Sequence, residues 1–309
     1  MTPDEFTNQE FQLPVGDGHE LYVHDWGNPK AKTPIVSLHG GPGSGSKDSH
    51  KQRFDPRVQR VIFHDQRGAG RSTPYGSLEH NTTLDLVEDI EKIAEKLNLT
   101  KFILVGSSWG STLALAYALQ HPKRIKALVI SGVFTASAQE LQYLDYGLYR
   151  THFPDVWQAY LDATPPEHHA DPTAYHVARI LGDDKAAAIA SARAYSAHEY
   201  QVMSLDDRTL PDTTPDEDYD LAKTKLGVHY LSNGCFLDDR TILNNARAIK
   251  TPTWIVQGRY DFVCPPITAW QLHQALPKSQ LIWTQAGHGA DRSNYETIRT
   301  LLLSLGENV

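Results

Sequence analysis

The sequence is most informative at residues 102–111, which read Phe102-Ile103-Leu104-Val105-Gly106-Ser107-Ser108-Trp109-Gly110-Ser111. The first four residues form a short, continuous apolar run, which is typical of a strand buried on both faces of a parallel sheet. A helical pattern then runs to Gln120 and ends before His121-Pro122, because proline disfavours a helical conformation in the residue that precedes it. The segment therefore predicts a strand, a tight turn and a helix in direct succession.

Similar apolar runs on both sides of this segment extend the strand pattern. They lie at 35–38, 61–63, 127–130, 254–256 and 281–283, and two further strands are expected at 11–13 and 20–26. After Thr82-Thr83, which can cap a helix, apolar residues repeat at helical spacing; they are Leu84, Val87, Ile90, Ile93 and Leu97. Strands that alternate with helices indicate an α/β fold, with a mostly parallel central sheet and helices on both faces.

The stretch from Phe134 to Arg240 interrupts this alternation. It is rich in alanine, tyrosine and histidine, and it contains an acidic segment at 212–220. A loop of that length inside a compact sheet is implausible, so we interpret it as an inserted helical cap above the carboxyl ends of the strands. The expected division is a core formed by 1–133 and 241–309, with a helical cap subdomain at 134–240.

Composition limits the classes of partner. The 309 residues carry a formal net charge of −8 and no segment rich in lysine and arginine, which makes nucleic acid an unexpected partner. No apolar run approaches the length of a membrane span, and the start of the chain lacks the pattern of a secretory signal, so a cytoplasmic location is expected. Cys235 and Cys264 have no metal-ligand spacing, and we expect no metal. The oligomeric state stays open.

Gly106-Ser107-Ser108-Trp109-Gly110 has the Gly-x-Ser-x-Gly spacing of a nucleophile elbow. A serine on a sharp strand-to-helix turn needs small neighbours because the backbone is strained and closely packed. The turn also places the N–H of Trp109 at a helix N-terminus, where it can stabilise an oxyanion. The context predicts an α/β-hydrolase fold with Ser108 as the nucleophile; the glycine spacing excludes the rival Ser107.

A second oxyanion donor is expected from His39-Gly40-Gly41-Pro42-Gly43, which follows the strand at 35–38. The alternative is a glycine- and proline-rich turn without a catalytic role. The acid and the base of the triad should follow Ser108 in that order. Asp261 and His288 each come after one of the last two strands, so we predict that Asp261 orients His288 as the general base.

Other residues of the same types compete for these roles. Asp238 and Asp239 are alternative acids, but they precede the penultimate strand instead of following it. The histidines at 39, 64 and 121 lie on the wrong side of the nucleophile for the expected order. Asp261 and His288 are therefore preferred.

Several motifs together resemble the proline iminopeptidase family. They are His39-Gly40-Gly41-Pro42-Gly43, Asp65-Gln66-Arg67-Gly68-Ala69-Gly70-Arg71-Ser72, the elbow at 106–111, Gly258-Arg259-Tyr260-Asp261 with Cys264-Pro265, and Gly287-His288. The resemblance spans nearly the whole chain. It implies a capped α/β-hydrolase that releases N-terminal proline from short peptides without a cofactor, with oxyanion donors at the N–H groups of Gly41 and Trp109. It also implies that Glu199, in the cap, binds the ammonium group of the substrate.

Three positions depart from the family pattern. Gly227 occupies the place of a second cap glutamate, Leu144 and Asp145 occupy places where tyrosines are usual, and Ser131 replaces an arginine. Glu199 could alternatively be a solvent-facing helix residue. The sequence thus predicts a serine aminopeptidase that acts on N-terminal proline or on a wider range of small N-terminal residues. A carboxylesterase or amidase with a different small-molecule substrate, and a non-catalytic receptor on the same scaffold, are the alternatives.

Overall fold

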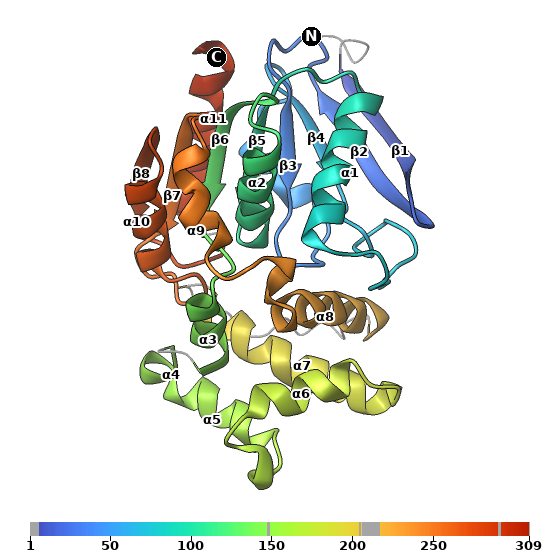
Figure 1. Cartoon of the computed structure of the whole chain (residues 1–309), viewed down its shortest axis with the longest axis vertical. Helices are drawn as coiled ribbons and strands as arrows, with labels where there is room; N and C mark the ends of the chain where they lie inside the picture. The colour runs from blue at the N-terminus through green and yellow to red at the C-terminus, as the bar shows by residue number, and fades with distance from the viewer. Residues whose placement is uncertain (1–5, 147–148, 204, 206–216, 290–291, 309) are drawn as a thin grey trace.

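The structure is a computed structural model that describes residues 6–146, 149–203, 205, 217–289 and 292–308. For residues 144–146, 217–220 and 306–308 the description covers the backbone alone. Within the described residues, one eight-stranded sheet has the order β1-β2-β4-β3-β5-β6-β7-β8 (Figure 1). The strands are β1 (Thr7–Gly16), β2 (His19–Gly27), β3 (Ile35–Leu38), β4 (Arg60–His64), β5 (Phe102–Ser107), β6 (Ile125–Ser131), β7 (Thr253–Gly258) and β8 (Ser279–Thr284).

The sheet is antiparallel at one edge and parallel elsewhere. β1 pairs with β2 and β2 with β4 in antiparallel register, whereas each pair from β4 and β3 through to β8 is parallel. In this register Ser107 pairs with Ser131, at the ends of β5 and β6. The carboxyl ends of the parallel strands therefore meet at one edge, where ligands bind in open α/β sheets.

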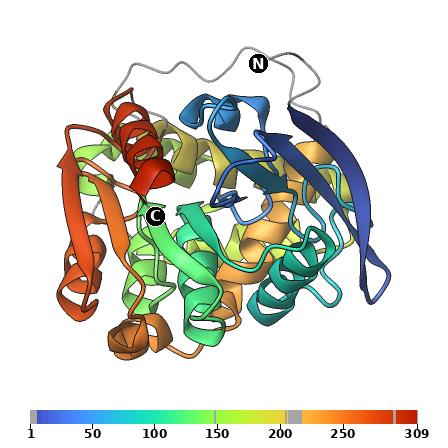
Figure 2. The ribbon, with the colours of Figure 1, turned by 90° about the horizontal axis from the view of Figure 1, so that it is seen from above.

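The continuous apolar runs supply two separate cores. Phe102 and Leu104 of β5 pack into one buried cluster, and Ile103 and Val105 pack into another on the opposite face. Helices α1 (Thr83–Lys96), α2 (Trp109–Gln120), α9 (Thr241–Asn245) and α10 (Pro266–Ala275) contribute to the first, and α11 (Arg292–Asn308) contributes to the second. Figure 2 shows these helices on the two sides of the sheet. The α/β-hydrolase architecture expected from the sequence is confirmed.

Helix α1 begins where the capping residues indicate. Thr82 is the N-cap, and its side chain forms a reciprocal capping box with Asp85. Of the apolar residues at helical spacing, Val87, Ile90 and Ile93 are fully buried. Leu84 is 54% exposed, because it lies in the first turn on the side that faces solvent. Its inclusion in the apolar face was wrong.

The chain between β6 and β7 is a helical insertion below the carboxyl ends of the strands in Figure 1. Its helices are α3 (Ala138–Tyr146), α4 (Tyr149–His152), α5 (Pro154–Asp162), α6 (Pro172–Ile180), α7 (Lys185–Val202) and α8 (Glu217–Ser232). Helices α6, α7 and α8 share a small core of their own, formed by Ile180, Ala188, Ala192, Leu221 and Val228. The residue boundaries expected for the cap stay a prediction. No described helix has the length and apolar character of a membrane span.

His64 is a buried histidine at the carboxyl end of β4, and it is 1% exposed. Burial lowers the pKa of His64 to about 3, and the neighbouring His39 acts in the same direction against the opposing charge of Asp65. The folded protein therefore holds this imidazole neutral over the whole range in which an exposed histidine would take up a proton.

We expect that lowering the pH from 7 to 5 destabilises the fold and that His64→Leu removes part of that loss. An unfolded histidine has a pKa of about 6.5, so below that pH the unfolded state binds a proton that the folded state does not, and the free energy of unfolding falls. This group accounts for about 2 kcal/mol between the two pH values. Urea unfolding at pH 7 and pH 5 measures the effect; equal losses in both proteins would contradict it.

Candidate active site

Ser108 lies on the turn between β5 and α2 with φ +56° and ψ −129°. A positive φ is uncommon for a residue with a side chain, and it stores backbone strain. The flanking glycines allow the turn to pack. A Cβ at Gly106 would overlap the carbonyl group of Gly110, and a Cβ at Gly110 would lie 2.5 Å from the carbonyl oxygen of Leu38. The local sequence thus holds Ser108 in the conformation of a nucleophile elbow.

Asp261 and His288 form a buried hydrogen-bonded pair at the ends of the next strands along the sheet. Asp261 follows β7 and His288 follows β8; His288 Nδ1 lies 2.9 Å from Oδ2 and 3.1 Å from Oδ1 of Asp261. The Oδ1 atom also accepts hydrogen bonds from the N–H groups of Val263 (3.0 Å) and Cys264 (2.7 Å). These bonds fix the carboxylate against the imidazole.

The environment of His288 suits a general base. Burial disfavours the charged imidazole, but the Asp261 carboxylate outweighs this effect and raises the pKa of His288 well above its usual value. Because Nδ1–H donates to Asp261, the neutral ring keeps Nε2 as a proton acceptor. The neighbouring Cys264 does not compete as a nucleophile at neutral pH, since burial raises the pKa of its thiol to about 11.

Contacts along the sheet edge bring Ser108 to this pair. The N–H of Ser108 donates to the carbonyl oxygen of Ser131 over 3.0 Å. The next residue, Gly132, has φ +51°, and a Cβ there would lie 3.0 Å from His288 Cε1. Glycine is therefore required between the serine and the imidazole. The three residues chosen from the sequence gather at one edge, and their assignment as a catalytic triad is a proposal taken up below.

The competing residues lie in other surroundings. Asp239 accepts a hydrogen bond from the N–H of Ala138 over 2.8 Å. His121 stacks on Tyr117, with ring centroids 4.8 Å apart, and His64 lies in the sheet. It is Asp261 that contacts the imidazole of His288.

Gln257 is a functional candidate that the sequence reasoning missed. It is fully buried at the end of β7, and its Nε2 donates to Asp261 Oδ2 (3.0 Å) and to the carbonyl oxygen of Cys264 (3.1 Å). Its Oε1 accepts from the N–H of Val133 over 2.9 Å. One amide thus joins the acid to the backbone that follows β6. A polar residue after the apolar run 254–256 was the available signal.

The loop after β3 lies directly against the elbow. A Cβ at Gly40 would be 3.3 Å from Ser108 Cβ, and Gly41 has φ +118°, which favours glycine. Trp109, which begins α2, has its N–H at the positive end of the helix dipole. This arrangement supports Gly41 and Trp109 as the two oxyanion donors, an assignment that stays a proposal.

A buried network connects the loop after β3 to Trp109, the residue after Ser108. His39 Nδ1 lies 2.9 Å from the carbonyl oxygen of Gly40, and its Nε2 accepts from the N–H of Gln66 over 3.0 Å. The Gln66 side chain donates to the carbonyl oxygen of His39 (3.0 Å) and accepts from the indole N–H of Trp109 (2.9 Å). Burial lowers the pKa of His39, so the ring stays neutral and the network keeps its directions.

The charged residues of the 65–72 segment brace the same loop. Asp65 accepts from the N–H (2.6 Å) and hydroxyl (2.5 Å) of Ser46 and from the guanidinium Nε of Arg71 (2.9 Å). Arg67 forms a buried bidentate pair with Asp89, at 2.7 and 2.9 Å. Asp65 and Arg71 therefore hold the loop after β3 through Ser46, and Arg67 joins the 65–72 segment to helix α1.

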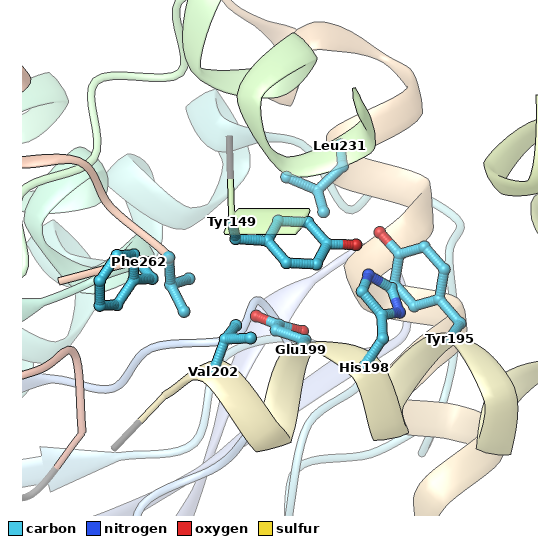
Figure 3. Close-up of a pocket in the computed structure, with 8 residues that line it drawn as sticks. Tyr149, Tyr195, His198, Glu199, Val202, Leu231 and Phe262 are labelled. Carbon is cyan, nitrogen blue, oxygen red and sulfur yellow. The ribbon is translucent and has the colours of Figure 1, made fainter. Parts of the chain in front are cut away.

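Glu199 lines a pocket between the helical insertion and the loop after β7, together with Tyr149, Tyr195, His198, Val202, Leu231, Phe262 and Val263. Figure 3 shows its carboxylate between Tyr149 and Val202, inside the ring of lining side chains. Burial lowers the pKa of His198 to about 4, so this neighbour is neutral at pH 7. Among the described residues, Glu199 has no ion-pair partner. Glu199 is half-buried, so it is not the solvent-facing helix residue that the sequence left as an alternative.

The remaining predicted positions differ in what can be said of them. The side chains of Leu144 and Asp145 lie outside the described residues. Gly227, on α8, is described, and the nearest atom to a Cβ built there is the carbonyl oxygen of Pro42 at 3.9 Å. No group of three or more candidate metal ligands occurs in the part of the chain that the structure describes.

Comparisons with known proteins agree with the fold. Residues 33–290 match the alpha/beta hydrolase fold family. A proline iminopeptidase from Mycobacterium smegmatis superposes with a TM-score of 0.67 at 22% identity, covering 97% of this chain and 98% of that one. An esterase from Exiguobacterium antarcticum has the same TM-score at 20% identity, covering 97% and 100%. At these identities the likeness shows the fold alone.

Sequence similarity is more specific than structural similarity. A proline iminopeptidase from Xylella fastidiosa (strain Temecula1) is 42% identical over 283 residues, which cover 90% of each chain. Another, from Xanthomonas citri, is 40% identical over 294 residues, which cover 94% of each. Matches of this extent confirm the resemblance found in the motifs: the chain belongs to the proline iminopeptidase family of α/β hydrolases.

Proposed function

We propose that the protein is a serine aminopeptidase that releases N-terminal proline from short peptides through an acyl-enzyme. The observation that carries this proposal is the position of Glu199. Its carboxylate lines the pocket that also contains Phe262 and Val263, the two residues after Asp261. A carboxylate that forms no ion pair with any other described residue, close to Asp261, suits a substrate whose cationic N-terminus is near its scissile bond. The names of the relatives support the same activity.

Glu199 can select for a free N-terminus by charge. An α-amino group has a pKa of about 7.7–8.0, so it is largely protonated at neutral pH. A hydrogen bond between this cation and a carboxylate is worth about 1.5–3 kcal/mol. Tyr149 stacks on the neutral ring of His198, with centroids 5.9 Å apart, and gives the pocket an apolar wall beside the charge. The site thus combines one anionic contact with a surface for an apolar ring.

In the proposed acylation step, Ser108 Oγ attacks the carbonyl carbon of the N-terminal residue while His288 Nε2 takes the hydroxyl proton. The N–H groups of Gly41 and Trp109 stabilise the oxyanion that develops. Asp261 stabilises the imidazolium because it accepts from Nδ1. Collapse of the tetrahedral intermediate breaks the C–N bond, and His288 returns the proton to the leaving amine.

Deacylation uses the same groups with water in place of the leaving amine. His288 removes a proton from water, the hydroxide adds to the acyl carbonyl, and the proton returns to Ser108 Oγ as the ester bond breaks. Since His288 must be neutral to act and Asp261 raises its pKa, we expect the acid limb of the pH profile above the range of an ordinary histidine. The Glu199 contact adds an alkaline limb, because it needs a protonated substrate amine.

The second candidate is a carboxylesterase or amidase. The esterase that superposes with this chain has the same arrangement of sheet and helices, and a fold of this kind serves many reactions. The two candidates differ in what Glu199 contributes: an aminopeptidase needs its charge, and an esterase does not.

We expect turnover of an amide with a free N-terminal proline and none of its N-acetylated twin. Ser108→Ala should lower kcat on the order of 10⁶-fold, because it removes the attacking oxygen. Ser107→Ala, at the adjacent hydroxyl, is the matched control and should retain most activity. The turnover of fluorogenic amides and of a short acyl ester is measured for the wild type and for both variants. A loss below about tenfold in Ser108→Ala would mean that another residue is the nucleophile, and turnover of the ester alone would favour the second candidate.

We expect Glu199→Gln to lower kcat/KM for free-amine substrates by about 10- to 150-fold, which corresponds to the loss of about 1.5–3 kcal/mol of charge-assisted bonding. The alkaline limb of the profile should weaken at the same time. Glu167→Gln makes the same charge change at an exposed cap residue and serves as the control. Steady-state kinetics from pH 6 to 10 give the answer. Equal losses in both variants would show that only the net charge of the cap matters.

We expect Gln257→Met to lower kcat/KM by about tenfold, or about 1.4 kcal/mol, and to move the acid limb to higher pH. Asp261 would lose one of the hydrogen bonds that its carboxylate accepts, so more of its negative charge would stabilise the imidazolium of His288 and raise the pKa of that imidazole further. Gln280→Met changes an exposed glutamine on the neighbouring strand β8 and is the control. The pH–rate profile measures the shift, and an unchanged acid limb with unchanged kcat would rule out a positioning role for Gln257.

A further inference from the structure

The two edge strands of the sheet differ in how their open sides are protected. An edge strand exposes unpaired N–H and C=O groups, and charges, prolines and bulges keep other strands from binding there. β1 has all three, because Glu10 and Pro14 are exposed and the register shifts between Pro14 and Gly16. β8, at the left edge in Figure 1, reads Ser-Gln-Leu-Ile-Trp-Thr and contains no charged residue and no proline. Among the described residues it pairs with β7 alone, so its outer side lacks these protections.

The bonds between β7 and β8 show which residues of β8 face outward. The carbonyl oxygens of Lys278 and Thr284 accept from backbone N–H groups at the two ends of β7, each over 2.9 Å. The N–H and C=O groups of one strand residue point to the same side, and that side alternates from one residue to the next. Even-numbered residues of β8 therefore face β7. The outward backbone groups belong to Ser279, Leu281 and Trp283.

The side chains of β8 alternate between the two faces of the sheet. Ser279 Oγ lies 2.8 Å from Nδ1 of His273 on α10, so the odd-numbered side chains share the face covered by α10. The ring of His273 contacts that of Trp270, which is 47% exposed. Ile282 lines a groove of about 390 Å³ on the other face, together with Glu296, Thr297, Thr300, Leu301 and Ser304 of α11. An exposed tryptophan thus flanks the open edge on one face, and a groove flanks it on the other.

We propose that β8 binds β8 of a second copy of this chain, in antiparallel register about a two-fold axis at Leu281. This register places Leu281 opposite Leu281 of the second copy, and Ser279 opposite Trp283. Each of these pairs exchanges two N–H···O bonds, so the outward backbone groups of the strand are all bonded. A shift of the register in either direction leaves one of the three residues without a partner within β8. The two sheets join into one sheet that runs through the dimer.

The side chains on the α10 face fit this register. Trp283, the largest of the outward residues, lies opposite Ser279, the smallest, so bulk on one copy meets space on the other. Ser279 contacts His273, and His273 contacts Trp270, so the exposed Trp270 of each copy lies close to Trp283 of the other. A contact about a two-fold axis requires this kind of self-complementarity.

Charges on the α11 face match as well. Lys278, just before β8, is exposed, and in this register it lies opposite Thr284 of the second copy. Thr284 bonds to Asn294 of α11, and Glu296 lines the groove on the same face. The two-fold axis therefore brings a lysine of each copy toward a glutamate of the other. Glu296 already accepts from Arg292 over 2.7 Å, but a carboxylate can accept several bonds. An exposed pair of this kind sets orientation more than affinity.

The mass of the full chain in solution tests the dimer. We expect light scattering after size-exclusion chromatography to give twice the chain mass of 34.5 kDa at about 100 µM protein. Ile282→Lys should give a monomer, because a lysine on an edge strand prevents pairing. Gln9→Lys adds the same charge to β1, is the matched control and should stay dimeric. Circular dichroism shows whether each variant is folded. A monomeric wild type would overturn the proposal, and so would an Ile282→Lys protein that is folded and dimeric.

Cysteine cross-linking tests the register. Residue 280 of one copy lies opposite residue 282 of the other in a non-hydrogen-bonded pair, whose Cα atoms are about 4.5 Å apart and suit a disulfide. Mild oxidation of the double variant Gln280→Cys/Ile282→Cys should therefore give a covalent dimer on non-reducing gels. Each single variant is a control, because its two cysteines lie diagonally, about 7 Å or more apart. Cys235 and Cys264 are buried and stay out of the reaction. A covalent dimer of Gln280→Cys alone, or none of the double variant, would overturn the pairing.

Discussion

The strained backbone of Ser108 is the constraint around which the rest of the molecule is arranged. A side-chain-bearing residue at φ +56° persists only where its surroundings determine it strongly. Here β5 and α2 hold the turn from both ends, and the N–H of Ser108 is bonded to β6. The glycines at 40, 106 and 110 let three backbone segments approach this point. The buried sheet holds the ends of the turn in place, and the turn fixes the orientation of the Ser108 hydroxyl.

The same type of side chain serves opposite purposes in this protein according to its partner. His288 has a carboxylate beside it, which raises the pKa of the imidazole and prepares it to accept a proton. Burial lowers the pKa of His39 despite the opposing charge of Asp65, and this ring stays neutral as a fixed hydrogen-bonding unit between Gly40 and Gln66. Desolvation acts on both; the charge of Asp261 decides the difference.

Sequence reasoning reached the fold, and it selected Ser108, Asp261 and His288 because each of them follows a recognisable strand. The apolar runs give the strands, and parallel strands deliver their carboxyl ends to one edge. It did not reach Gln257 or the bonds between His39, Gln66 and Trp109. The His39–Gln66 bonds join residues 27 positions apart and the Gln66–Trp109 bond joins residues 43 positions apart, and no local periodicity records them. Glu199 came from family resemblance alone, since half-buried glutamates on helices are common.

The cap and the core are joined by backbone as well as by side chains. The N–H of Gly289 donates to the carbonyl oxygen of Met203 over 2.7 Å, which links the residue after His288 to the end of the helix that carries Glu199. A backbone bond is indifferent to the side chains on either element. This bond therefore holds the end of α7, the helix that carries Glu199, next to the loop that carries His288, whichever side chains the two segments bear.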